Sequence, residues 1–150
     1  MTGFLLDTNA ISLLAPTKAK PVPGFAEWVE RRDFEGKIFL SAVSIHEMQR
    51  GIHRLDAAGA VRKAEALKRW LLGLIEGYDE KILPVALWTA ILSGQAEAAA
   101  IGAGRNPGMA DALIAGTARE FDLIVVTDNL GDFIACGMSP LRPIDAVGQE

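Results

Sequence analysis

FLLD (residues 4–7) and DLIVVTD (residues 122–128) are the two stretches that decide the fold. Each is a short apolar run that ends in an aspartate, and the second is β-branched, as is typical of a central parallel strand. Ligands of open parallel sheets bind at the carboxyl ends of the strands. The two stretches therefore predict a parallel sheet with Asp7 and Asp128 at the edge where a site would lie.

The rest of the chain alternates between helical and extended patterns. Two capping details are expected: Asn9 as the N-cap of the first helix, and Pro107 at the first position of a late one. Helices are predicted at TNAISLLA (8–15), GFAEWVERRD (24–33), from Ser44 to the Ala58–Gly59 break, roughly 60–76, at ALWTAILSGQAEAAAIG (86–102) and at MADALIAGTAREF (109–121), and strands at GKIFLSAVS (36–44), KILPVA (81–86) and, as an edge strand, MSPLRPIDAV (138–147). This alternation predicts an α/β fold with helices on both faces of the sheet.

Length and composition indicate one domain over residues 1–150. The chain has 150 residues, of which 50% are hydrophobic, enough for a single continuous core. No apolar run reaches membrane-spanning length, and FLLD follows Met1 without a basic leader. The single cysteine, Cys136, excludes an internal disulfide and paired-thiolate metal sites. We expect a cytoplasmic protein.

The charge is unevenly distributed along the chain. The net charge is −4, which by itself argues against a nucleic-acid partner. Residues 1–70, however, carry eleven Lys and Arg against eight Asp and Glu, whereas residues 71–150 carry four against eleven. The basic first half permits RNA binding without requiring it, because ordinary solvated surfaces could produce the same split.

Several carboxylates are candidates for one site, and each also has a structural explanation. Asp7 ends a strand, where a solvated residue is natural. Glu47 follows Ser44 at the spacing of a capping box. Asp111 lies in the first turns of an apolar helix, where it would complement the helix dipole. The loop TDNLGDF (127–133) offers Thr127, Asp128, Asn129 and Asp132, residue types that also form turns and caps.

If these carboxylates converge, they require a cation between them, because they would otherwise raise one another's pKa. An all-oxygen ligand set favours Mg²⁺ or Mn²⁺ over zinc. The chemistry that uses such a site is phosphodiester hydrolysis by metal-activated water. The histidines do not change this interpretation: HEMQRGIH lacks the HExxH zinc spacing, so His46 and His53 are expected to be surface or packing residues.

Four spaced motifs resemble the PIN-domain nucleases, and more narrowly the VapC-type toxins of VapBC toxin–antitoxin pairs. They are LLDTN (5–9), EMQRG (47–51), ADALIA (110–115) and T-x-N-x-x-D-F (127–133), in the expected order. Each motif is short, but the ordered set is fairly specific. The resemblance implies a PIN-like three-layer α/β/α sandwich with a mainly parallel sheet.

The resemblance also implies a function: a Mg²⁺- or Mn²⁺-dependent endoribonuclease, homodimeric and inhibited by an antitoxin protein. It assigns metal-binding or catalytic roles to Asp7, Glu47 and Asp111. Many of these toxins have Arg-Asn-x-x-Asp-Phe where this chain has Asp128 in place of Arg. We favour Asp132 as the fourth acid over Asp128 and the Asn129 position. Contacts with the RNA substrate are expected from Thr8, Asn9, Arg50, Arg54, Thr127 and Asn129.

Two other functions compete with this one. An aspartyl phosphatase of the haloacid-dehalogenase type also begins with a strand ending in Asp, but its second Asp, two residues on, is Asn9 here. A PIN domain that has lost its activity and only binds a partner would carry much the same sequence. A phosphorelay receiver is disfavoured, because FLLD has one acid and LIVVTD has no lysine.

Overall fold

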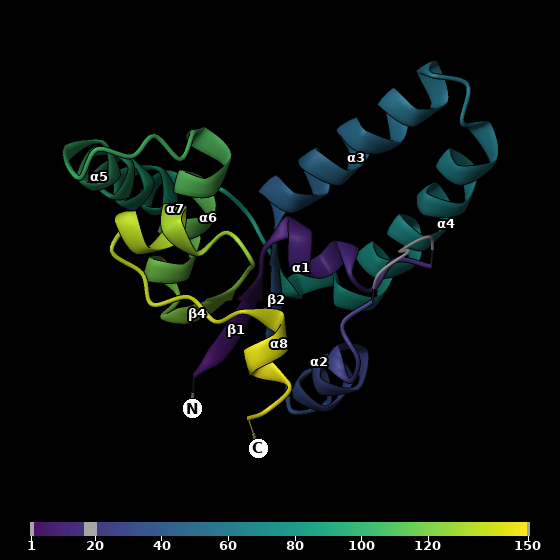
Figure 1. The fold of residues 1–150 in the computed structure, drawn as a ribbon, viewed down its shortest axis with the longest axis horizontal. Helices are drawn as coiled ribbons and strands as arrows, with labels where there is room; N and C mark the ends of the chain where they lie inside the picture. Colours follow the sequence, from purple (N-terminus) through teal and green to yellow (C-terminus); the bar gives the residue numbers. More distant parts are fainter. Residues whose placement is uncertain (1, 17–20, 150) are drawn as a thin grey trace.

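The computed structural model describes residues 2–16 and 21–149, with helices on both faces of one sheet (Figure 1). The strands are β1 (Gly3–Leu6), β2 (Ile38–Ser41), β3 (Ile82–Leu83) and β4 (Leu123–Val126), in the spatial order β3-β2-β1-β4. Every neighbouring pair is parallel. The predicted parallel sheet is confirmed, and β1 and β4, the strands that end near Asp7 and Asp128, lie side by side.

Helices connect and cover these strands. They are α1 (Thr8–Ser12), α2 (Phe25–Phe34), α3 (Ala42–Ala57), α4 (Val61–Tyr78), α5 (Leu87–Gly102), α6 (Met109–Glu120), α7 (Leu130–Ala135) and α8 (Pro143–Ala146), with a 3₁₀ turn at Asp79–Lys81. Because successive side chains of a strand point to opposite faces of the sheet, each strand packs against helices on both faces. Leu5 and Val125 pack with α5, α6 and α7, while Leu6 and Val126 pack with α1 and α2. The fold is the three-layer α/β/α sandwich that the sequence predicts.

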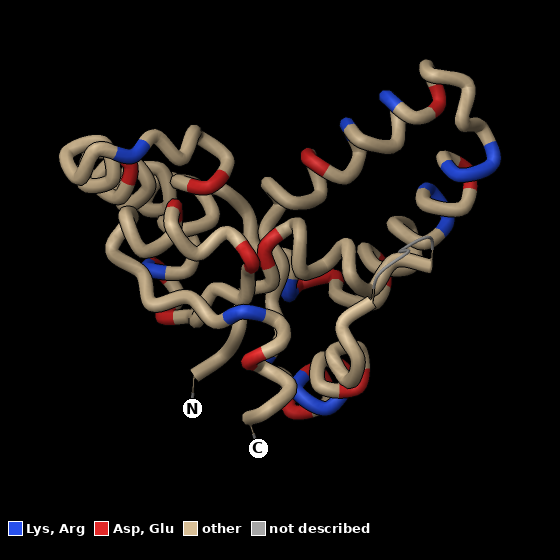
Figure 2. Tube along the Cα trace, viewed as in Figure 1, with Lys and Arg blue, Asp and Glu red and all other residues tan. Residues whose placement is uncertain are grey.

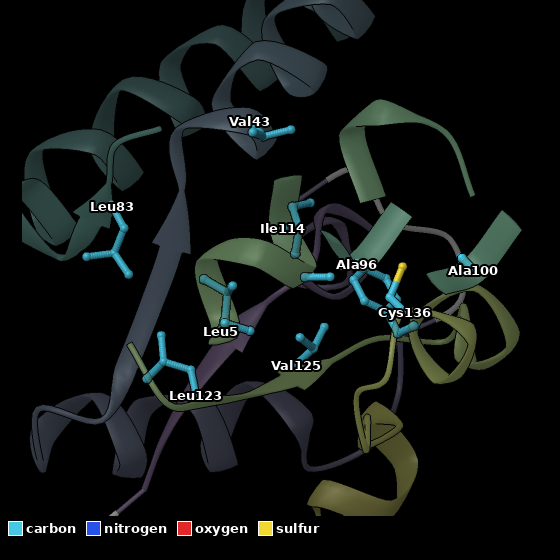
Figure 3. Close-up of a cluster of buried hydrophobic side chains, with 12 residues drawn as sticks. Leu5, Val43, Leu83, Ala96, Ala100, Ile114, Leu123, Val125 and Cys136 are labelled. Atoms are coloured by element: carbon cyan, nitrogen blue, oxygen red, sulfur yellow. The ribbon is translucent and has the colours of Figure 1, made fainter. Parts of the chain in front are cut away.

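The layer formed by α5 and α6 is unusually close-packed. Ala96 and Ala100 of α5 belong to one buried cluster with Ile114 of α6 and the strand residues Leu5 and Val125 (Figure 3). Gly116 of α6 is a point of close approach, because a Cβ there would collide with Ser93 Oγ and lie 2.7 Å from Ser93 N. Small residues on the facing surfaces bring α5 and α6 close together.

Helices α3 and α4 form an antiparallel pair, which we call the arm, projecting from the sheet (Figure 1). The predicted stripe of Ile45, Met48, Ile52 and Leu55 packs against Leu67, Leu71, Leu74 and Ile75 of α4. The turn between the helices includes Gly59 at φ 88°, which confirms the predicted break. The arm therefore has an apolar cluster of its own, and its residues Met48 and Leu74 also pack against the main core.

Four local predictions were wrong, two of them at helix starts. The N-cap of α1 is Asp7, since the helix starts directly after the strand, and Asn9 lies inside it. Pro107 precedes α6 rather than starting it. Gly108, at φ 86°, is the N-cap, and that conformation suits glycine.

The other two concern strands. The strand predicted over 81–86 is only Ile82–Leu83, because Pro84 cannot donate to the ladder. The tail provides a single parallel bridge from Leu141 to Val126 in place of an edge strand, and Pro143 then starts α8. In residues 2–16 and 21–149 no helix is both long and apolar enough to cross a membrane.

Candidate active site

Asp7 and Thr127 lie next to each other where two parallel strands end. Asp7 follows β1 and Thr127 follows β4, and the Asp7 N–H donates to the Val126 carbonyl at 3.0 Å. The Asp7 side chain is only 4% exposed and Thr127 is fully buried. The carboxyl edge of the sheet therefore carries a buried carboxylate, as the strand ends predicted.

Three donors hold the Asp7 carboxylate in one orientation. Its Oδ1 accepts from the Thr8 N–H at 2.8 Å, and its Oδ2 accepts from Thr127 Oγ1 at 2.8 Å and Asn9 Nδ2 at 2.9 Å. Burial raises the pKa of Asp7, these hydrogen bonds oppose the increase, and the charge of Glu47 adds to it. Asp7 is thus a rigid, partly destabilised anion, a suitable state for a cation ligand.

Glu47 reaches the same edge from α3. The Thr8 hydroxyl contacts Glu47 Oε1 at 2.7 Å and Ser44 Oγ at 2.9 Å. A hydroxyl has one hydrogen and a carboxylate only accepts, so Thr8 donates to Glu47, and Ser44 donates to Thr8. Residues 8, 44 and 47 therefore form one chain of hydrogen bonds beside Asp7.

The capping box considered for Ser44 and Glu47 is not formed. Helix α3 begins two residues earlier, and its N-cap is Ser41, whose Oγ accepts from the Val43 N–H at 3.0 Å. Ser44 is buried inside the helix and bonds to Thr8. Glu47 is left free of a capping role, and its carboxylate faces α1.

Asp111 and Asp132 are joined by an amide. Asn129 Nδ2 donates to Asp111 Oδ2 and to Asp132 Oδ2, both at 2.9 Å. Burial, followed by the charges of Asp7, Asp132 and Glu47, raises the pKa of Asp111 to about 7. The Asn129 N–H also donates to Thr127 Oγ1, the hydroxyl that binds Asp7, so hydrogen bonds connect Asp111 and Asp132 to Asp7.

Arg105 is a member of the site that the sequence did not indicate. Its Nε donates to Asp132 Oδ1 at 2.5 Å, and this hydrogen bond is the main reason why the pKa of Asp132 is lowered. The guanidinium lies over Gly131, where a Cβ would be 2.5 Å from Arg105 Cζ. Arg105 comes from a loop rich in glycine and proline, where a lone exposed arginine gives no local signal.

The remaining predicted residues divide into two groups. Asn9 Oδ1 accepts from the Asp128 N–H at 3.1 Å, and Thr127 Oγ1 accepts from the Asn129 N–H at 2.9 Å. The Asp128 side chain is exposed, so this residue joins the network through its backbone. On α3, Arg50 lies 3.8 Å from Glu47 in an exposed ion pair of small energetic value, and Arg54 is exposed one turn further on.

The donor chemistry of this edge fits a divalent cation such as Mg²⁺ or Mn²⁺. All four carboxylates offer oxygen, and their mutual repulsion is the kind that a cation relieves. Within residues 2–16 and 21–149, no three Asp, Glu, His or Cys side chains are close enough to enclose one ion. Mg²⁺ commonly keeps several waters and binds through one or two carboxylates, so the arrangement suits such an ion.

Known proteins are similar to this chain in both sequence and fold. Toxin FitB of Neisseria gonorrhoeae is 30% identical over 142 residues, covering 93% of this chain and 97% of that protein. Plasmid stability protein StbB of Pseudomonas syringae pv. tomato is 26% identical over 144 residues, covering 95% and 99% respectively. Both relatives are therefore matched over nearly their whole length.

Solved structures are also similar to this chain in fold. FitAcB from Neisseria gonorrhoeae superposes with a TM-score of 0.77 at 28% identity, covering 93% of this chain and 97% of that one. DNA-bound VapBC from Salmonella typhimurium gives a TM-score of 0.68 at 27% identity, covering 95% and 99%. The sequence pattern of the PIN domain matches residues 4–133, from β1 through Asp132. The chain therefore belongs to the PIN-domain family.

Proposed function

We propose that this chain is a metal-dependent endoribonuclease and the toxin of a type II toxin–antitoxin pair. The observation that carries the proposal is the hydrogen-bond network at the carboxyl edge of the sheet, which links Asp7 to Glu47 through Thr8 and to Asp111 and Asp132 through Thr127 and Asn129. Such a set of oxygen ligands is suited to phosphodiester hydrolysis.

The relatives support the biological role. FitB is named as a toxin, StbB as a plasmid stability protein, and the structural neighbours are the FitAcB and VapBC complexes, the latter bound to DNA. By this analogy we propose that the chain pairs with a cognate antitoxin protein, forms a homodimer and acts in the cytoplasm. The family also makes a haloacid-dehalogenase-type phosphatase a poorer explanation of Asp7.

Asp7 and Asp111 would be the main ligands of Mg²⁺ or Mn²⁺, with Glu47 as a further ligand or base and Asp132 as the fourth acid. A divalent ion here would lower the pKa of water and stabilise charge on the phosphate. Thr127, Asn9 and Thr8 fix the direction of Asp7 through the hydrogen bonds described above. Asn129 sets the separation of Asp111 and Asp132.

Thr8 provides a link between two of the acids. Its N–H binds Asp7 and its hydroxyl binds Glu47, so one residue orients both carboxylates. If Glu47 accepts a proton from water, Thr8 would keep that carboxylate facing the site. Arg50 and Arg54, on the exposed side of α3, would contact phosphates of the RNA substrate.

The test is cleavage of a mixed structured RNA by the purified protein in EDTA, Mg²⁺ or Mn²⁺. Asp7→Asn is the active-site variant, and Asp56→Asn, an exposed aspartate on α3, is the matched control. We expect metal-dependent cleavage by the parent and by Asp56→Asn, and its loss in Asp7→Asn. Equal cleavage by Asp7→Asn would show the assignment of the centre to be wrong.

An absence of cleavage under every condition would favour the other possibility, a PIN domain that only binds a partner. A phosphatase assay on the same preparations would then separate it from the haloacid-dehalogenase alternative. Glu47→Gln and Asp111→Asn extend the test, because a ligand role predicts weaker Mn²⁺ binding whereas a pure base role for Glu47 predicts unchanged Mn²⁺ binding with lost turnover.

A further inference from the structure

Arg105 contacts one of the four candidate acids from a neighbouring loop. It lies between α5 and α6, and its Nε donates to Asp132 Oδ1 at 2.5 Å. The Asn129 amide donates to the other oxygen of the same carboxylate and links it to Asp111. Both oxygens of Asp132 therefore already have a partner, and one of these partners carries a positive charge.

Positive charge is scarce on this side of the sheet. Residues 87–135, from α5 through α7, contain two arginines and no lysine against six Asp and Glu. Figure 2 shows the blue segments mainly along the arm and around α2. The second arginine of this range, Arg119, donates to the Cys136 carbonyl. Of the two arginines, Arg105 is therefore the one that neutralises a candidate acid.

Part of the Arg105 guanidinium is available to a ligand. Its side chain is 52% exposed, whereas the side chain of Asp132 is 18% exposed. Within residues 2–16 and 21–149, Nε is the guanidinium nitrogen that has a hydrogen-bond partner, so Nη1 and Nη2 keep their N–H groups. An arginine fork of this kind matches the oxygens of a phosphate group.

An ordinary surface ion pair is the other explanation of this contact, and such a pair would contribute little. Here, however, the acid is mostly buried and hydrogen-bonded into the candidate site. The guanidinium also packs closely on Gly131 of α7, where a Cβ would lie 2.5 Å from Arg105 Cζ and 2.7 Å from Nη1. Gly131 therefore leaves the space in which the guanidinium reaches Asp132.

This placement affects how many cations the site can hold. Two-metal sites that cleave phosphodiesters hold their ions about 3.5–4 Å apart, and the second ion stabilises the leaving oxygen. A guanidinium bonded to Asp132 repels a divalent ion at that carboxylate. The same guanidinium supplies positive charge of its own beside the acids.

We propose that Arg105 replaces a second divalent ion at the candidate site. It neutralises Asp132 and binds a phosphate of the RNA substrate through Nη1 and Nη2, while the site holds one divalent ion. The proposal rests on the proposed ribonuclease function and adds to it a substrate-binding residue and an ion count. A phosphate is favoured over the carboxylate of an acidic peptide, because the neighbouring oxygen ligands suit phosphodiester chemistry.

The first measurement is Mn²⁺ binding by isothermal titration calorimetry to the parent, Arg105→Gln, Gly131→Ala and Gly94→Ala. We expect one Mn²⁺ per parent chain. Arg105→Gln and Gly131→Ala should bind Mn²⁺ about 2- to 10-fold more tightly, because the first removes the opposing charge and the second displaces it. Gly94→Ala makes the same substitution on α5, where a Cβ meets nothing within 4 Å, and should bind as the parent does.

The second measurement is steady-state cleavage of the mixed structured RNA at saturating Mn²⁺. Arg105→Gln should lose about 100-fold in kcat/KM, the lower end of the loss for one donor to a developing charge, despite its tighter Mn²⁺ binding. Arg105→Lys keeps the charge and should recover part of this loss. Gly131→Ala should also lower kcat/KM, but it should cost nothing further in the Arg105→Gln background, because it acts through the guanidinium.

Each contrary result has its own meaning. Two Mn²⁺ per parent chain, or unchanged Mn²⁺ binding by Arg105→Gln, would show that Arg105 does not replace an ion. Parent-like cleavage by Arg105→Gln would show that the guanidinium does not bind the substrate, and a simultaneous loss of antitoxin binding would assign it to a carboxylate of that protein. A parent that binds one Mn²⁺ and cuts no RNA would overturn the ribonuclease function and the phosphate contact, whereas tighter Mn²⁺ binding by Arg105→Gln would still support the ion replacement.

Discussion

Thr127 Oγ1 donates a hydrogen bond to Asp7 Oδ2 at 2.8 Å, joining residues that are 120 positions apart in the sequence. Because both side chains are buried, the bond replaces water as a partner of the carboxylate. Thr127 Oγ1 also accepts from the Asn9 side-chain amide and the Asn129 N–H. One hydroxyl therefore connects the ends of β1 and β4.

Thr127→Val should destabilise the protein. The substitution keeps the shape but removes the donor, so Asp7 loses a buried partner and two N–H groups lose their acceptor. We expect a decrease of about 1–3 kcal/mol in the free energy of unfolding, measured by urea denaturation. Thr127→Ser retains the hydroxyl, so its free energy of unfolding should decrease clearly less than that of Thr127→Val. Equal stability of the Val and Ser variants would show that the hydrogen bonds contribute little.

The raised pKa of Asp111 predicts a pH dependence of stability in the metal-free protein. The value rises from 3.8 to about 7, mainly through burial. Between these pH values the folded protein keeps a proton that the unfolded chain releases, so the free energy of unfolding should fall as pH rises from about 4 to about 7. Urea denaturation in EDTA measures this decrease. Asp111→Asn should show a smaller one, with Asp7, whose pKa is also raised, contributing the remainder.

Arg105→Gln should raise the pKa of Asp132. The guanidinium is the main cause of the low pKa of this carboxyl, and Gln can hydrogen-bond but carries no charge. Titration of the Asp132 carboxyl carbon by NMR would measure the change. Arg142→Gln, at an exposed arginine paired with Asp145, is the control and should leave Asp132 unaffected. An unchanged Asp132 pKa in Arg105→Gln would show that the ion pair is absent in solution.

Gly116→Ala should be strongly destabilising for a purely steric reason. The added Cβ would lie 2.7 Å from the backbone N of Ser93, so α5 and α6 would have to move apart. Overpacking of this kind typically costs about 1–3 kcal/mol. Thermal unfolding measures the loss, and Gly94→Ala on α5, where a Cβ meets nothing within 4 Å, should be neutral or stabilising. A neutral Gly116→Ala would mean that the helices separate easily.

The position of the candidate site at one edge of the sheet could be predicted because it follows from strand direction. Parallel strands that neighbour each other end together, so Asp7 and Thr127 had to meet once β1 and β4 paired. Glu47 and Asp111 were candidates from the sequence itself, and the resemblance to PIN domains assigned them metal-binding or catalytic roles. The position of Asp7 and Thr127 depends on which strands pair and in which direction, and the apolar runs of the sequence specify those strands.

The contacts that could not be predicted are those whose residue spacing fits a local contact and a distant one equally well. Ser44 and Glu47 have capping-box spacing, yet they bond to Thr8, which is 36 and 39 residues away. Arg105 is linked to Asp132 across 27 residues, and no periodicity marks an exposed arginine in a loop. These pairings form only when α1 packs against α3 and the loop between α5 and α6 lies against α7.

Replacing Asn129 with Asp tests how one further carboxylate at the candidate site changes the stability of the protein. Its amide donates to Asp111 and Asp132, so Asn129→Asp exchanges two hydrogen bonds for repulsion between three acids. We expect the variant to unfold at a lower urea concentration than the parent in EDTA, and Mn²⁺ to restore more stability to it than to the parent, since a cation offsets the added charge. Asn129→Ser removes the bridge without adding charge and should gain no extra stabilisation from Mn²⁺. If Mn²⁺ stabilises Asn129→Asp and Asn129→Ser equally, the cation does not bind among these carboxylates.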